Sequence, residues 1–412
     1  MSNKYIINLN NCQSITIYNG TESVPFISRN NSVSSVKSEQ AEVKAEFDSL
    51  IGWDIAEELE EDINNDDLPY RQNKIKTVPL ERVYLNRSEI ERAEQVHNCS
   101  TFLEFTLEKD KTIDKKKLHR INSCKRRLCP ACMYRKSLKH FANMKRITAE
   151  VERDYKRKGH HIRYIFITLT MENVCGGVLP VAVTRLLKGF ENFRRKRIGG
   201  DNKYLGDIFF GMARALEITV DRNEYITSAM YERKKEYYNS RGLHKGDKNP
   251  NYLMFHPHIH IIACTTYEMY GKDKIFIDNF KLSEMWQECL KVDYMPITDI
   301  RPFKAKHATT AGKELAEIAK YTVKPSEYLT GDIEEDSVVI GYLDTALYNR
   351  RLVAYTGIFK EIYKELKLND KIDKEDNNLD TDTVLLRYFW DFTKTLYYRD
   401  KDYCLKGEPI EE

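Results

Sequence analysis

Three histidines stand at alternate positions in residues 255–264, FHPHIHIIAC: His256, His258 and His260. Alternate side chains of a β-strand share one face, so a strand here would project the three imidazoles together and turn Ile259 the other way. Clustered imidazoles bind divalent metal ions. Structural histidines in an ordinary strand would be the better explanation for one such residue, but they are a weaker one for three in phase. We therefore expect a metal site on this strand.

Polar side chains recur at helical spacing in residues 312–324, GKELAEIAKYTVK. On the predicted helix, Glu317 and Tyr321 are four residues apart and Tyr321 and Lys324 three apart, so the three side chains project from adjoining turns. Pro325 cannot continue the helix and biases Lys324 away from helical geometry. Taken alone, the stretch is better explained as an amphipathic helix with a polar face.

Together, the histidine strand and the Tyr-x-x-Lys spacing resemble the HUH endonuclease superfamily. Residues 164–170, YIFITLT, look like the first motif of that family, a buried strand that ends in small hydroxyl residues. Within the superfamily, residues 317–328, EIAKYTVKPSEY, are similar to the replication initiators of rolling-circle plasmids from bacteria. The resemblance runs from about Cys99 to about Leu366, and residues 350–360, RRLVAYTGIFK, also fit that group.

The resemblance implies a protein that binds a plasmid origin and nicks one DNA strand. Tyr321 would attack a phosphodiester, forming a 5′-phosphotyrosine link and freeing a 3′-hydroxyl primer, and a second cleavage with strand joining would terminate the round. In similar initiators, a glutamate at the position of Glu317 assists the terminating cleavage. Tyr328 is the rival second nucleophile, but Pro325 separates it from the helix, so we predict a substrate-contact or packing role for it.

A cation held by imidazoles would polarise the scissile phosphate, and Lys324 would add positive charge nearby. His258 and His260 are the first candidate ligands. The third ligand stays open, because Glu217 matches a carboxylate that related enzymes place on a neighbouring strand, while His256 competes for the same place. A mixed histidine and carboxylate site suits Mg²⁺ or Mn²⁺.

A separate cysteine cluster precedes the histidine strand. Cys124, Cys129 and Cys132 have the spacing C-x4-C-x2-C, and Cys99 lies upstream of them. Four thiolates make a closed, structural Zn²⁺ site, and similar plasmid initiators carry a cysteine cluster too. His97 is the alternative fourth ligand, and free cysteines in a reduced cytosol are the alternative to zinc. The neighbouring basic residues are predicted to contact DNA phosphates, with a solvated charged face as the alternative: Lys125, Arg126, Arg127 and Arg135.

Charge is distributed unevenly along the 412 residues. Residues 1–75 carry 6 basic and 13 acidic side chains, and residues 331–412 carry 12 and 19. Since the whole chain has a formal charge of +3, residues 76–330 carry +17. A strongly basic middle between acidic ends is the pattern expected of a DNA-binding core.

We predict an α+β protein with the HUH endonuclease fold, in which helices pack on a central antiparallel sheet. Residues 1–75 would be an acidic, partly disordered extension, 76–158 a zinc-binding and DNA-contact module, and 159–330 the nicking-closing domain. Residues 331–412 would be a helical region that includes a helix at 385–398. Within the nicking-closing domain the expected elements are strands at 161–170, 211–221, 252–265 and 295–302 and helices at 180–196, 276–291 and 310–323.

The expected partners are origin DNA, single-stranded or extruded as a hairpin, together with a host helicase and DNA polymerase. A homodimer is a further candidate. No apolar run approaches the ~20 residues that span a bilayer, and no signal segment is evident, so we expect a cytoplasmic protein with no membrane partner. Two other functions stay open: an HUH transposase or relaxase of a mobile element, and a non-catalytic, zinc-bearing DNA-binding regulator.

Overall fold

The chain divides into two compact units. The smaller unit comprises Met1–Ile75, Asn98–Ser123 and Asp373–Glu412, and the larger one comprises Lys76–His97 and Cys124–Ile372. The computed structural model describes residues 69–108, 116–198, 203–266, 277–303, 315–316, 323–373 and 383–400, with the backbone of β1 (Ile6–Ile7) and β2 (Ile15–Thr16). The expected acidic extension therefore lies largely outside the described residues.

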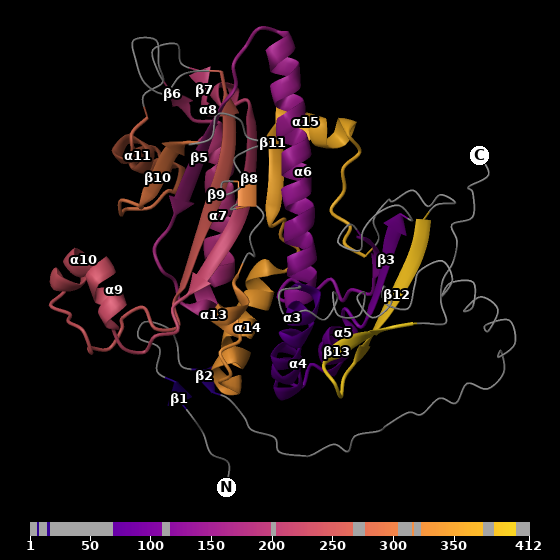
Figure 1. Cartoon of the computed structure of the whole chain (residues 1–412). Helices are drawn as coiled ribbons and strands as arrows, with labels where there is room; N and C mark the ends of the chain where they lie inside the picture. The colour runs from indigo at the N-terminus through magenta and orange to yellow at the C-terminus, as the bar shows by residue number, and fades with distance from the viewer. Residues whose placement is uncertain are drawn as a thin grey trace, which may run out of the picture. The chain divides into compact units, whose positions relative to one another are not determined.

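A five-stranded antiparallel sheet forms the centre of the larger unit, in the order β10-β5-β9-β8-β11. Its strands are β5 (Arg163–Thr170), β8 (Gly211–Val220), β9 (Phe255–Thr265), β10 (Thr298–Pro302) and β11 (Val353–Gly357). The four strands expected in the nicking-closing domain are confirmed. The histidine strand, β9, is the middle strand of the sheet (Figure 1).

Helices cover both faces of this sheet. The longer ones are α6 (Pro130–Arg157), α7 (Leu179–Arg194), α11 (Asn279–Leu290), α14 (Ile333–Leu347) and α15 (Ile358–Glu365). The shorter ones are α4 (Thr77–Asn86), α5 (Ile90–Asn98), α8 (Leu205–Ile208), α9 (Ser228–Arg233), α10 (Lys235–Asn239) and α13 (Pro325–Tyr328). Among the helices of the described segments, none combines the length and the apolar character needed to cross a membrane.

The two faces of the sheet follow from the alternation of side chains along its strands. Ala213, Ala215 and Ile262 share a buried cluster with α6 and α15. Arg214 points to the opposite face, where its guanidinium lies 5.8 Å from the ring centre of Phe190 in α7. Because His258 and His260 have the same parity as Ile262, the histidines lie on the face that α6 and α15 cover.

The smaller unit is built on a second antiparallel sheet, in the order β13-β12-β3-β4. It consists of β3 (Phe102–Glu108), β4 (Lys117–Ile121), β12 (Thr383–Asp391) and β13 (Leu396–Arg399), together with helix α3 (Pro69–Ile75). Its core is formed by apolar and aromatic side chains of β3, β4, β12 and β13. The helix expected at 385–398 is therefore wrong, and the C-terminal region is not all helical.

The strand character of β12 has a physical reason. Its core-facing residues are Leu386, Tyr388 and Trp390, which alternate along the chain and join the core of the second sheet. Aromatic side chains favour strands, where they pack against cross-strand neighbours, and the ring centres of Tyr388 and Phe105 are 5.7 Å apart. That partner comes from a distant part of the sequence, so the pairing that makes this segment a strand could not be identified from the local sequence.

Gly357, at the end of β11, has a backbone that other residues rarely adopt, with φ 56° and ψ −144°. A Cβ atom there would lie 1.9 Å from the carbonyl oxygen of Phe210. We expect Gly357→Ala to lower the free energy of unfolding by about 3 kcal/mol, since both the dihedral angles and the contact oppose a side chain. Chemical denaturation measures this. The matched control is Gly177→Ala, whose Cβ would meet nothing within 4 Å, and equal losses in both variants would contradict the prediction.

Candidate active site

Two adjacent strands bring three candidate metal ligands together on the histidine face of the larger sheet. Glu217 of β8 pairs directly with His258 of β9 in the strand register. One carboxylate oxygen of Glu217, Oε2, lies 3.0 Å from Nε2 of His260 and 3.5 Å from Nε2 of His258. The ligand atoms of all three lie within 4.8 Å of one another. We call Glu217, His258 and His260 the metal trio.

The remaining ring nitrogens of the two histidines have partners of their own. Nδ1 of His258 lies 3.2 Å from the carbonyl oxygen of His256, which can only accept a hydrogen bond. Nδ1 of His260 lies 3.1 Å from the hydroxyl oxygen of Thr168. When both Nδ1 atoms donate, the lone pairs of both Nε2 atoms converge beside the Glu217 carboxylate, as metal ligation requires.

The Glu217 carboxylate is held ionised by its surroundings. Burial raises its pKa, but when the Nε2 atoms of His258 and His260 carry protons, their hydrogen bonds to the carboxylate and their charges outweigh this effect and hold the pKa well below its usual range. An ionised carboxylate with two imidazoles is a donor set that accepts a divalent cation. The residues present therefore fit a metal ion.

His256 shares the face of the metal trio without joining it. Its ring lies 5.3 Å from that of His258, centre to centre, and the rings are stacked. Glu217 and His256 were the two candidates for the third ligand, and among the described residues the group of close ligand atoms contains Glu217 with His258 and His260. Burial, with the charge of His258, lowers the pKa of His256 to about 4, so this ring stays neutral at physiological pH.

Of the residues expected near the nucleophile, Glu317 and Tyr321 lie outside the described residues. Lys324 is exposed and has an extended backbone with ψ 134°, as Pro325 leads one to expect. Tyr328 is fully buried and its hydroxyl donates a hydrogen bond to the carbonyl oxygen of Leu128 at 2.6 Å. The structure thus gives Tyr328 a packing position.

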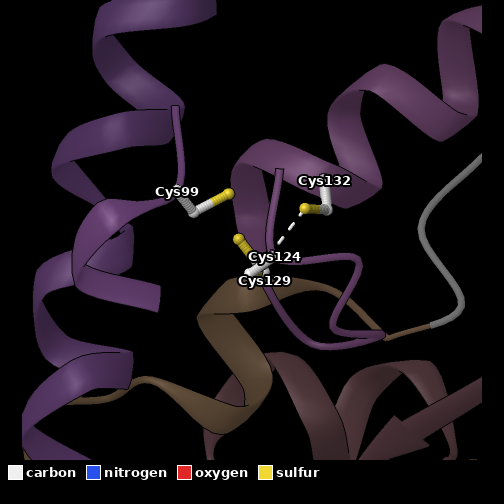
Figure 2. Close-up of side chains that lie close together, drawn as sticks. All are labelled: Cys99, Cys124, Cys129 and Cys132. Atoms are coloured by element: carbon white, nitrogen blue, oxygen red, sulfur yellow. Dashed lines mark hydrogen bonds between the residues drawn. The ribbon is translucent and has the colours of Figure 1, made fainter. Parts of the chain in front are cut away.

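The four cysteines of the predicted zinc site also come together, as Figure 2 shows. The sulfur atoms of Cys99, Cys124, Cys129 and Cys132 lie within 4.8 Å of one another, and those of Cys124 and Cys132 are 3.6 Å apart. A tetrahedral site with Zn–S bonds of about 2.3 Å has sulfurs about 3.8 Å apart. In the described structure, none of the four forms a disulfide bond. The alternative ligand, His97, instead places Nδ1 3.0 Å from a carboxylate oxygen of Glu81.

Comparison with known proteins identifies the family to which the chain that carries these sites belongs. The family model described as replication protein, Rep_1, matches residues 115–398. The chain belongs to this family. It is 32% identical over 298 residues to a "Protein rep" of Bacillus sp, covering 68% of this chain and 83% of that protein.

Further relatives carry the same name. A "Protein rep" of Bacillus amyloliquefaciens is 30% identical over 322 residues, covering 73% of this chain and 82% of that protein. One of Streptococcus pneumoniae is 28% identical over 313 residues, or 74% of this chain and 83% of that protein. No solved structure matches the chain. The expected resemblance to plasmid replication initiators is confirmed at the level of a replication protein.

The basic residues predicted to contact DNA differ in exposure. Lys125 is exposed, in a left-handed turn with φ 57°. Arg126 donates from Nε to the side-chain oxygen of Gln95 at 3.0 Å, and burial lowers the pKa of Arg127. Arg135 is buried in α6, with 7% of its surface exposed. Of these four residues of the replication protein, Lys125 is the best placed for a phosphate.

Thr168 is a functional candidate that sequence reasoning did not single out, although it lies in the strand compared with the first family motif. It pairs with His260 across β5 and β9, and this register was not readable from sequence. We expect Thr168→Val to weaken Mn²⁺ binding about tenfold, because partners of this kind fix the tautomer and orientation of a ligating imidazole. Electron paramagnetic resonance of Mn²⁺ gives the affinity.

The matched control for that variant is Thr170→Val. Thr170 lies on the same strand and pairs with His258 in the register, but its hydroxyl donates to the carbonyl oxygen of Ile297 at 2.6 Å. An equal loss of affinity in both variants would show that the hydroxyl of Thr168 has no special role.

The cysteine cluster gives a second measurable expectation. Cys129 precedes the first residue of α6, and serine is a favourable residue at such a helix start, so Cys129→Ser removes a thiolate without penalising the helix. We expect the variant to lose bound zinc and to unfold about 10 °C lower, since structural zinc contributes directly to folding. Elemental mass spectrometry and thermal unfolding measure the two effects.

Cys289→Ser is the control, because Cys289 is a buried free thiol outside the cluster. It is expected to keep the zinc. Full zinc content in Cys129→Ser would contradict the assignment of this cluster.

Proposed function

We propose that this replication protein is a rolling-circle plasmid initiator that binds its origin and nicks one strand through Tyr321. The observation that carries the proposal is the convergence of two histidine Nε2 atoms, from the central strand of an antiparallel sheet, with an ionised carboxylate from the neighbouring strand. A non-catalytic regulator gives no reason for this arrangement. The family's description as replication protein favours an initiator over a transposase or relaxase.

In the proposed reaction, the Tyr321 oxygen attacks the scissile phosphorus in line and the bond from phosphorus to the 3′-oxygen breaks. The products are a 5′-phosphotyrosine link, which conserves the bond energy for rejoining, and a 3′-hydroxyl that primes synthesis. In the terminating cleavage, Glu317 accepts a proton from the attacking water, whose oxygen bonds to phosphorus as the bond from phosphorus to the 3′-oxygen breaks. The 3′-hydroxyl freed in this step then attacks the phosphotyrosine link, which joins the strands and releases the Tyr321 phenol. The exposed ammonium of Lys324 adds positive charge beside the phosphate.

The metal trio would hold Mg²⁺ or Mn²⁺, which when bound polarises the scissile phosphate as a Lewis acid. The chain's own part is to orient that ion: Thr168 and the carbonyl of His256 fix the two imidazoles, and the buried Glu217 supplies charge. The four cysteines would hold a structural Zn²⁺. The net charge of +17 on residues 76–330 supports the proposal that this part of the chain is a DNA-binding core.

These assignments extend to the organisation of the protein. We assign the HUH fold and the nicking-closing role to residues 159–330 together with β11, the edge strand of the same sheet. We assign a zinc-binding and DNA-contact role to residues 76–158. The proposal includes a host helicase and polymerase for strand displacement, since the freed 3′-hydroxyl must be extended. It also includes a cytoplasmic location, with a homodimer as a candidate assembly.

The test is to incubate the protein with Mn²⁺ and a single-stranded oligonucleotide that carries the candidate origin of its plasmid. A covalent protein–DNA species on a denaturing gel, absent when the metal is chelated, is the expected result. Digestion should place the nucleotide on the peptide that contains Tyr321. DNA binding without any adduct, over several origins and metals, would overturn the nicking proposal in favour of a regulator.

A further inference from the structure

The segment that directly follows the proposed nucleophile is anchored to the body of the larger unit. Val323 is buried, with 3% of its surface exposed, and Tyr328 is held by its hydrogen bond to Leu128. Between them, Glu327 accepts a hydrogen bond at Oε2 from the backbone N–H of Val220, at 3.0 Å. Residues 323–328 are therefore fixed at the start by Val323 and at the end by Glu327 and Tyr328.

The partner of Glu327 lies at the end of the strand that carries Glu217. Strand β11 pairs with β8 from Gly211 to Ala215, and Leu216 N–H donates to Leu352 on that side. By the alternation of an antiparallel strand, the N–H of Val220 points to the same side, beyond the end of this pairing. Because β11 does not extend to Val220, no strand accepts a hydrogen bond from that N–H, and the Glu327 carboxylate accepts it instead. Figure 1 shows α13 beside this end of β8.

Glu327 also lies within the electrostatic field of the metal trio. Burial raises its pKa, whereas the Val220 N–H and the charge of Lys324 lower it, and the charges of Glu217 and His258 act on it as well. A carboxylate in this position has two possible roles. Its charge could act on the metal ion from outside the ligand set, or its hydrogen bond could anchor residues 323–328 to β8. The direct bond to the backbone of β8 favours the anchor.

We propose that Glu327 is a positioning residue that fixes residues 323–328, the segment that follows Tyr321 in the chain, relative to the metal trio. This inference rests on the proposed function, because it assumes that Tyr321 attacks a phosphate held by the trio. The hydrogen bond between Glu327 and Val220 is close in sequence to both groups: Glu327 follows Tyr321 along one stretch of chain, and Val220 follows Glu217 along another. Since a displacement of about 1 Å can cost about 10²-fold in rate, such an anchor matters for in-line attack.

The test compares Glu327→Ala with Glu327→Gln, whose amide oxygen still accepts from Val220 N–H. We expect the rate of adduct formation to fall about 100-fold in the alanine variant and to stay within about threefold of the wild type in the glutamine variant. The affinities for Mn²⁺ and for the origin strand should stay the same in both. Equal loss in both variants, no loss in the alanine variant, or a tenfold drop in Mn²⁺ affinity would each overturn the anchor.

A second readout separates this inference from the proposed function. If the wild-type protein forms no adduct, the nicking proposal fails, but hydrogen–deuterium exchange at the Val220 amide still tests the anchor. Exchange should be faster in Glu327→Ala and unchanged in Glu327→Gln, while exchange in the middle of β9 stays the same in all three proteins. Unaltered exchange at Val220 in the alanine variant would show that Glu327 does not hold the strand end.

Discussion

Replacing Tyr321 with phenylalanine is expected to abolish the covalent protein–DNA adduct, with a fall in rate of at least about 10⁴-fold. The phenol oxygen is the proposed nucleophile, and phenylalanine carries no oxygen that could form the bond to phosphorus. Phenylalanine keeps the ring, so zinc content, unfolding temperature and origin affinity should be unchanged. A denaturing gel with end-labelled origin strand measures the adduct, and a binding assay provides the comparison.

The matched control is Tyr328→Phe, because Tyr328 is the rival nucleophile. Its hydroxyl is buried and engaged with the carbonyl of Leu128, so this variant should still form the adduct, at a rate lowered by the loss of that anchor. A protease that cleaves after glutamate separates the two tyrosines, since Glu327 lies between them. An adduct on the Tyr328 peptide of the wild-type protein would refute the assignment of Tyr321.

The histidine face of β9 was predictable because the spacing of two is a local property of the chain. The ring centres of His256 and His258 are 5.3 Å apart and those of His258 and His260 4.9 Å, as three side chains on one face require. The choice between Glu217 and His256 was not local. It depends on the register of β8 against β9, which places Glu217 opposite His258.

Residues that act through backbone or hydroxyl contacts could not be found from sequence. Thr168 and Glu327 acquire their partners across strands and loops far apart in the chain, at His260 and Val220. The error at 385–398 has the same origin. There, pairing of β12 with β3 decided the conformation, and aromatic residues of the expected helix became part of the core of a sheet.

The metal trio yields the second large effect. We expect the double variant His258→Ala/His260→Ala to lose Mn²⁺ binding and to form the adduct at least about 10³-fold more slowly, because two of the three donors are gone and no ion polarises the phosphate. Both imidazoles lie on one face of the sheet and are largely buried, with 10% of the His258 side chain and 13% of the His260 side chain exposed. Mn²⁺ affinity and adduct rate should fall together.

His256→Ala is the control that makes this result specific. The three histidines share one strand and one face, and their rings are neighbours, so a general disturbance of the strand would appear in all variants. With Glu217 as the third ligand, His256→Ala should keep Mn²⁺ affinity within about threefold, whereas Glu217→Gln should weaken it strongly because an amide carries no charge. The opposite pattern would make His256 the ligand and leave Glu217 as an ionised neighbour, bonded to the two imidazoles without contacting the cation.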